Sequence, residues 1–103
     1  MKNKLLLKDY KNLISRGIKI NDSVYTYFIQ PQKNTIIKAA ASKNAGSAVK
    51  RNYEKRVIRS IFREITLKEN YILLAICRKK NQYTYLAKKN LIEKSLSAIV
   101  KTH

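Results

Sequence analysis

Apolar residues recur at helical spacing near the start of the chain. Residues 6–16 place one group of apolar side chains on a single side of a helix: Leu6, Leu7, Tyr10, Leu13 and Ile14. Arg16 falls in the last turn, and Gly17 follows where a left-handed residue often caps a helix. The pattern therefore predicts a short amphipathic helix that ends before Gly17.

The next segments have the β-branched and aromatic composition that strands prefer. Residues 23–30, SVYTYFIQ, predict a strand that ends at Pro31, because proline has no N–H to donate to a ladder. Residues 35–41, TIIKAAA, predict a returning strand and hence an antiparallel hairpin. The pattern leaves room for one further short strand before or within this hairpin.

Three more elements follow. The segment from Gly46 to about Thr66 has no proline and no other glycine, which favours a long helix. Residues 70–77, NYILLAIC, are almost continuously apolar, which is typical of a central strand buried on both faces. Thr84 can cap a last helix over about 85–101, with an apolar side formed by Leu86, Leu91, Ile92, Leu96, Ile99 and Val100.

The element order α-β-β-(β)-α-β-α predicts an α+β fold, a small α/β sandwich in which helices cover a mixed sheet. The length of 103 residues suits one domain, and no repeat or linker divides the chain, so we expect residues 1–103 to be a single domain.

Nucleic acid is expected as the partner because the chain carries 23 Lys and Arg against 6 Asp and Glu, a net charge of +17. Such a charge destabilises a folded chain through self-repulsion unless a polyanion screens it. An anionic membrane surface is the second candidate. There is no apolar run of the roughly 20 residues that span a bilayer, no signal-peptide core and only one cysteine, Cys77, so a cytoplasmic location is expected.

The long helix separates its cations from its apolar side chains. At about 100° per residue, one arc carries Arg51, Asn52, Lys55, Arg56, Arg59 and Arg63, and the other carries Val57, Ile58, Ile61, Phe62 and Ile65. Glu54, the only acid between Ser42 and Arg63, falls on the apolar side. Arginine suits two-pronged contact with phosphate, although an ordinary solvated face would also be cationic. The helix start at Gly46–Ser47 offers backbone N–H groups as a further anion site.

Aromatic side chains on the first strand are compatible with two interpretations. Alternation sends Tyr25 and Tyr27 to one face and Phe28 to the other. Such side chains can stack with single-stranded RNA, or they can be plain core.

The sequence offers little for a catalytic site of its own. His103 is the only histidine, and no paired-carboxylate motif or phosphate-binding glycine loop is present. Cys77 lies inside an apolar strand, which is typical of an inert buried thiol. If the chain takes part in catalysis, we expect it to position a substrate for another component.

Residues 42–64, SKNAGSAVKRNYEKRVIRSIFRE, resemble the signature of the bacterial ribonuclease P protein subunit. That signature has Ser-Lys-Lys, then Gly, then an Arg-Asn-Arg…Lys-Arg…Arg helix. Asp9-Tyr10, Gly17 and the closing strand and helix match as well, so the resemblance covers nearly the whole chain. Tyr53 stands where the motif has its second arginine, Asn44 replaces a lysine and Ser47 replaces an asparagine.

The resemblance implies a left-handed β-α-β crossover and a role as protein subunit of an endoribonuclease, a ribonucleoprotein whose RNA subunit carries the catalytic centre and its Mg²⁺. The partners would be ribonuclease P RNA and precursor tRNA, whose 5′ leader is cleaved off. RNA-binding candidates are Lys43, Lys50, Arg51, Asn52, Lys55, Arg56, Arg59 and Arg63, and leader-cleft candidates are Tyr10, Ile14 and Phe28. No catalytic residue and no metal ligand is assigned to the protein.

Two other hypotheses stay open at this point. One is a non-enzymatic RNA-binding module, such as a small ribosomal or RNA-chaperone protein. The other is a membrane-surface binder with a basic amphipathic helix, which we disfavour because that helix uses its apolar arc for the core. Nothing in the sequence points to a protein partner.

Overall fold

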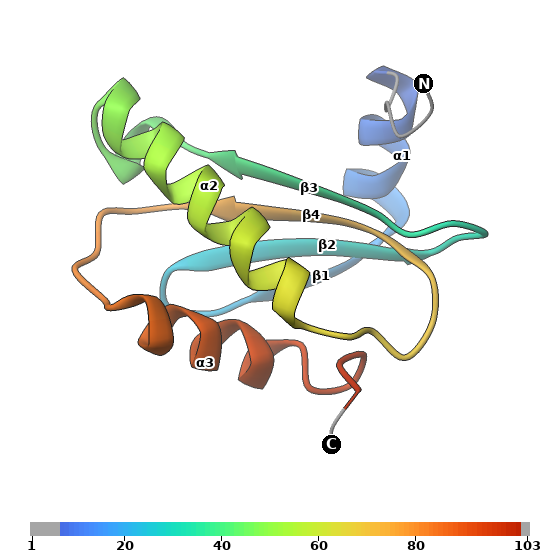
Figure 1. The fold of residues 1–103 in the computed structure, drawn as a ribbon. Coiled ribbons are helices and arrows are strands. Elements are labelled where there is room, and N and C mark those ends of the chain that lie inside the picture. The colour runs from blue at the N-terminus through green and yellow to red at the C-terminus, as the bar shows by residue number, and fades with distance from the viewer. Residues whose placement is uncertain (1–6, 102–103) are drawn as a thin grey trace.

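A four-stranded mixed sheet forms the centre of the fold, and helices lie on both of its faces (Figure 1). The computed structural model describes residues 7–101. In chain order the elements are α1 (Leu7–Arg16), β1 (Ile18–Asn21), β2 (Tyr25–Pro31), β3 (Ile36–Ala41), the short 3₁₀ helix η1 (Lys43–Ala45), α2 (Ala48–Glu64), β4 (Tyr71–Cys77) and α3 (Tyr85–Ser95). The predicted α+β order is confirmed, and β1 is the additional short strand. Leu6, which was expected in the first helix, lies outside the described residues.

The predicted hairpin between residues 23–30 and 35–41 is wrong. The strand order is β1-β2-β4-β3, so β4 lies between the two strands that were expected to pair. β4 runs antiparallel to β2 and parallel to β3. The reason is burial: β4 is almost entirely apolar and takes the central position, whereas the alanine-rich β3 is left at the edge. Pro31 is the last residue of β2 rather than the residue after it.

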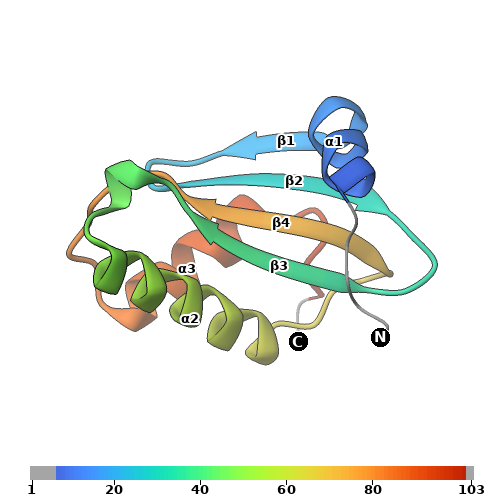
Figure 2. The same cartoon turned by 90° about the horizontal axis from the view of Figure 1, so that it is seen from above.

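The connection from β3 through α2 to β4 is a left-handed crossover. α2 and α3 lie on one face of the sheet and α1 lies on the other (Figure 2). When β3 and β4 are turned to point upward with α2 toward the viewer, β4 lies to the left of β3 (Figure 1). Nearly all such connections are right-handed, so the left-handed crossover that the resemblance implied is a distinctive feature of this fold.

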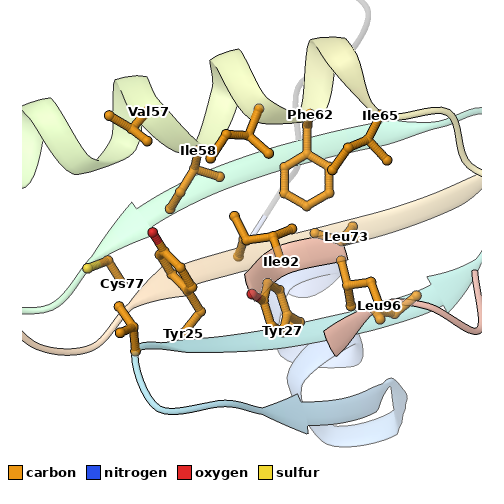
Figure 3. Close-up of a cluster of buried hydrophobic side chains, with 14 of the residues drawn as sticks. Tyr25, Tyr27, Val57, Ile58, Phe62, Ile65, Leu73, Cys77, Ile92 and Leu96 are labelled. Carbon is orange, nitrogen blue, oxygen red and sulfur yellow. The ribbon is translucent and has the colours of Figure 1, made fainter. Parts of the chain in front are cut away.

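Tyr25 and Tyr27 belong to the main core, under α2 and α3. Both are fully buried, with ring centroids 6.0 Å apart. Figure 3 shows both rings projecting from β2 into a cluster that includes Ile58 and Phe62 of α2. The hydroxyl of Tyr27 donates to a carboxylate oxygen of Asp22 at 2.8 Å. The core interpretation of these two aromatics is therefore correct, and they are not available for stacking with RNA.

Burial of these tyrosines predicts a loss of stability in alkali. Desolvation raises the pKa of Tyr25 and Tyr27 well above the ordinary tyrosine value of about 10. Above about pH 10 the unfolded chain therefore binds fewer protons than the folded chain, and the free energy of unfolding falls as pH rises. Each buried tyrosine contributes up to about 1.4 kcal/mol of loss per pH unit in that range. Urea unfolding from about pH 8 to about pH 11 measures this slope.

Tyr25→Phe is the matched control for that slope. The Tyr25 hydroxyl is buried without a hydrogen-bond partner among residues 7–101, so the substitution removes a titrating group without breaking such a bond. The variant is expected to fold normally and to lose stability less steeply above about pH 10. An identical slope in both proteins would contradict the assignment.

A second, smaller core lies between the sheet and α1. It contains Leu13, Phe28, Ile72 and Leu74. Gly17 lies at the junction between α1 and β1. It was expected to adopt the left-handed conformation, but its φ is not positive; the glycine with positive φ is Gly46. A Cβ on Gly17 would lie 2.5 Å from the carbonyl oxygen of Leu13 and 3.0 Å from that of Ile29. Glycine is therefore needed here for the close approach of α1 to β2.

The last helix is shorter than predicted. Thr84 caps α3 as expected, with its hydroxyl accepting from the Ala87 N–H at 3.1 Å, but the helix ends at Ser95. Leu96 and Val100 are buried beyond it, and Val100 forms a β-bridge with Leu67. Leu86 was placed on the apolar side, yet it is 64% exposed. Lys88 and Ile92 form the inward stripe of α3, and Leu86 lies on the opposite side.

Candidate nucleic-acid interface

The start of α2 is fixed by a glycine and a serine. Gly46 has φ 129°, a value that favours glycine. Ser47 is the N-cap, and its side-chain oxygen accepts from the Lys50 N–H at 3.3 Å. This places Lys50 and Arg51 in the first turns of the helix, beside the N–H groups that were expected to favour anions.

The two arcs of α2 are separated as predicted. The side chains turned into the core are Glu54, Val57, Ile58, Ile61 and Phe62. On the other arc, Asn52, Arg56, Arg59 and Arg63 are exposed, and Arg51 and Lys55 are half-buried; Lys50, which is also exposed, precedes them in the first turn. We call these seven residues the cationic arc. Because its only neighbouring acid within the first three turns, Glu54, is buried, the arc presents an uninterrupted positive surface.

Glu54 is neutralised by a lysine from the other covering helix. Lys88 Nζ lies 3.1 Å from Glu54 Oε1 and 3.3 Å from Glu54 Oε2. The two residues are 2% and 1% exposed. Lys88 Nζ also lies 5.1 Å from the centroid of the Tyr53 ring. A buried acid and a buried lysine therefore fix α2 against α3 while keeping negative charge away from the arc.

A second group of cations meets the start of α2, and this group was missed by sequence reasoning. The loop after β4 carries Arg78, Lys79 and Lys80. The Lys80 N–H donates to the carbonyl oxygen of Asn44 at 3.1 Å, and Ser42 Oγ donates to that of Arg78 at 2.9 Å. These contacts bring the loop beside η1, where Lys43 is exposed. The parallel pairing of β3 and β4 causes the meeting, because parallel strands end at the same edge of a sheet.

The opposite face of the sheet carries the three leader-cleft candidates. Phe28 is 8% exposed, Tyr10 is half-buried against the same cluster, and Ile14 is 51% exposed. Figure 2 shows α1 over one end of this face. The structure thus brings Tyr10, Ile14 and Phe28 to the same side of the sheet, although it places Ile14 facing outward from the helix rather than in the core.

Two lysines lie in the same cross-strand row as Phe28, and Lys19 is its direct neighbour. The pairing registers align Lys19 with Phe28, Phe28 with Leu74 and Leu74 with Lys38, which forms one row across the sheet. Residues directly opposite each other share a face, and Lys19 Nζ lies 5.8 Å from the centroid of the Phe28 ring. Phe28 is largely covered by the second core, so the row offers chiefly its two lysines, which can pair with the phosphates of a single strand of RNA. This row could not be predicted from the sequence, because it depends on the register in which the strands pair.

Groups that could perform chemistry on their own are sparse in this part of the chain. Within residues 7–101 no group of three or more His, Cys, Asp or Glu side chains could hold a metal ion. Burial raises the pKa of the Cys77 thiol, which leaves it a poor nucleophile. In the same range no helix is long and apolar enough to cross a membrane.

Comparison with known proteins gives a family from sequence and a shared fold from structure. The family model for ribonuclease P matches residues 2–103. A ribonuclease P protein component from a Nitratiruptor species is 34% identical over 55 residues, which are 53% of this chain and 50% of that protein. The chain therefore matches about half the length of this relative.

Two solved structures share the fold. The RNase P protein from Staphylococcus aureus superposes with a TM-score of 0.79 at 22% identity, over 92% of each chain. The RNase P protein from Thermotoga maritima superposes with a TM-score of 0.79 at 19% identity, over 93% of this chain and 96% of that one.

Proposed function

The chain belongs to the ribonuclease P protein family, and on that basis we propose that it is the protein subunit of a ribonuclease P that matures the 5′ end of tRNA. The observation that carries the proposal is the cationic arc of α2, from which the nearest acid is withdrawn into the core. Its partners would be ribonuclease P RNA and precursor tRNA, and its location the cytoplasm.

We assign the two RNAs to different surfaces. The cationic arc, together with Lys43, binds the phosphates of the RNA subunit. The row of Lys19, Phe28 and Lys38 on the opposite face, with Tyr10 and Ile14 of α1 beside it, takes the single-stranded 5′ leader. Because the surfaces lie on different sides of the sheet, one chain can hold both RNAs at once. The protein's contribution is to position the scissile phosphodiester.

The described residues do not fit a protein-held Mg²⁺, because they offer no cluster of three potential ligands. We therefore place the Mg²⁺ that supports hydrolysis on the RNA subunit and assign no step to a metal on this chain. The positive charge supplied by the protein lowers the concentration of Mg²⁺ that the RNA needs, since cations on the protein replace ions condensed on the phosphates.

Reconstitution tests the proposal. Adding the purified chain to a bacterial ribonuclease P RNA at low Mg²⁺ is expected to accelerate cleavage of a precursor tRNA at its 5′ maturation site. Comparison with a mature tRNA that lacks the leader controls for nonspecific nuclease. The absence of any gain in cleavage would contradict the proposal, and a general RNA-binding module would then be the better interpretation.

A further inference from the structure

A groove separates α2 from α3 on the outer surface of the helical layer. Its volume is about 340 Å³, and it is lined by Tyr53, Arg56, Val57, Ser60, Arg63 and Tyr85. Arg56 and Arg63 also belong to the cationic arc, so the groove is continuous with that surface. The feature that distinguishes it from the arc is aromatic: each of the two helices contributes one tyrosine.

Tyr53 is an exposed ring that is anchored on a buried cation. It is 47% exposed, and the Lys88 ammonium lies 5.1 Å from the ring centroid. Lys88 is itself fixed by Glu54 at 3.1 Å. A cation over the ring stabilises this placement, while nearly half of the tyrosine remains open to solvent. A ring fixed in this way can stack with a base at little further cost in side-chain entropy.

The second wall of the groove is also fixed. The Tyr85 hydroxyl lies 2.9 Å from Ser60 Oγ and donates to Glu64 Oε2 at 3.0 Å. Lys89 Nζ lies 2.9 Å from Glu64 Oε1, so the acid at this end of the groove is already paired. Neither Arg56 nor Arg63 forms an ion pair with any residue in the range 7–101. The groove is therefore positive as well as aromatic.

We propose that this groove binds one unpaired RNA base, stacked on Tyr53, with the adjoining phosphates held by Arg56 and Arg63. The occupant must be unpaired, because a base within a helix has both faces covered by its neighbours. Stacking tolerates any base, since every base has a π-face. Tyr53 stands where the family motif has an arginine, so this chain exchanges a phosphate contact for a base contact. The inference rests on the proposed function for the identity of the RNA.

Substitution of Tyr53 separates stacking from charge. The dissociation constant for ribonuclease P RNA is expected to rise about fivefold to a hundredfold in Tyr53→Leu and to stay within about twofold in Tyr53→Phe. Tyr53→Arg is expected to add about one phosphate contact, so the slope of log affinity against log salt should become steeper by about one. Val49→Ala, at an exposed apolar position of α2 outside the groove, is the matched control. Equal affinities for Tyr53→Leu, Tyr53→Phe and the unaltered chain would overturn the proposal.

Photo-crosslinking of the unaltered chain provides a test that no folding defect can obscure. A short oligouridylate containing 4-thiouridine is expected to crosslink to Tyr53 or Tyr85, and mass spectrometry of the peptides would show it. Crosslinks confined to residues outside the groove would overturn the proposal. This readout needs no ribonuclease P RNA. A groove that does not bind RNA can therefore be distinguished from a chain that does not act in ribonuclease P, because the cleavage assay with the unaltered chain tests the proposed function separately.

Discussion

Glu54→Ala is expected to lower the free energy of unfolding by about 3–5 kcal/mol, because it leaves the Lys88 ammonium buried without its carboxylate. Both oxygens of Glu54 lie within 3.3 Å of Lys88 Nζ, and both residues are almost fully buried. After the substitution the Tyr53 ring, whose centroid lies 5.1 Å from Lys88 Nζ, remains beside the ammonium but cannot replace the carboxylate. A loss of this size is a large share of the roughly 5–15 kcal/mol that stabilises a typical domain. Urea unfolding at neutral pH measures it.

Two controls show whether burial causes the effect. Glu64→Ala breaks the pair with Lys89, but both of those side chains are solvated, at 47% and 26% exposed, so a much smaller loss of stability than that of Glu54→Ala is expected. The double variant Glu54→Leu with Lys88→Met replaces both charges with apolar groups and is expected to be close to neutral. A small effect of Glu54→Ala, similar to that of Glu64→Ala, would contradict the role of the buried pair.

Arg56→Ala combined with Arg59→Ala is expected to weaken binding to ribonuclease P RNA and to make its salt dependence shallower. Both arginines are exposed on the cationic arc. Each phosphate contact that is lost reduces the counterions released on binding, so the slope of log affinity against log salt should fall by about two. The affinity difference should be largest at low salt. Filter binding over a range of salt concentrations measures both quantities.

Lys94→Ala combined with Lys101→Ala is the control for net charge. Both lysines are exposed and lie outside α2, and the substitution removes the same two positive charges. It is expected to change affinity through the overall field only and to leave the slope nearly unchanged. If the two double variants lost equal affinity and equal slope, net charge rather than the arc would account for binding.

The elements whose signals are local could be predicted from the sequence. The separation of cations from apolar side chains on α2 follows from helical periodicity, and the inward position of Glu54 came from the same spacing. The central position of β4 followed from its continuous apolar run. Thr84 was identified as a cap from its place before a periodic segment.

The features that were missed depend on contacts between distant segments. The pairing of β3 with β4 instead of β2 follows from which strand takes the centre of the sheet, and turn residues do not encode that choice. The partner of Glu54 could not be identified because Lys88 was not expected to be buried. The groove beside Tyr53 and the cations after β4 exist only once α3 and the sheet edge are placed.

The RNA that co-purifies with the chain tests the central claim most directly. Sequencing the RNA bound to the unaltered chain and to the Arg56→Ala, Arg59→Ala variant compares the intact cationic arc with one that lacks two of its arginines. Ribonuclease P RNA is expected to dominate the first sample and to be depleted in the second. Ribosomal RNA as the dominant species, or an RNA profile that the variant leaves unchanged, would contradict the claim that this arc anchors the chain to a ribonuclease P RNA.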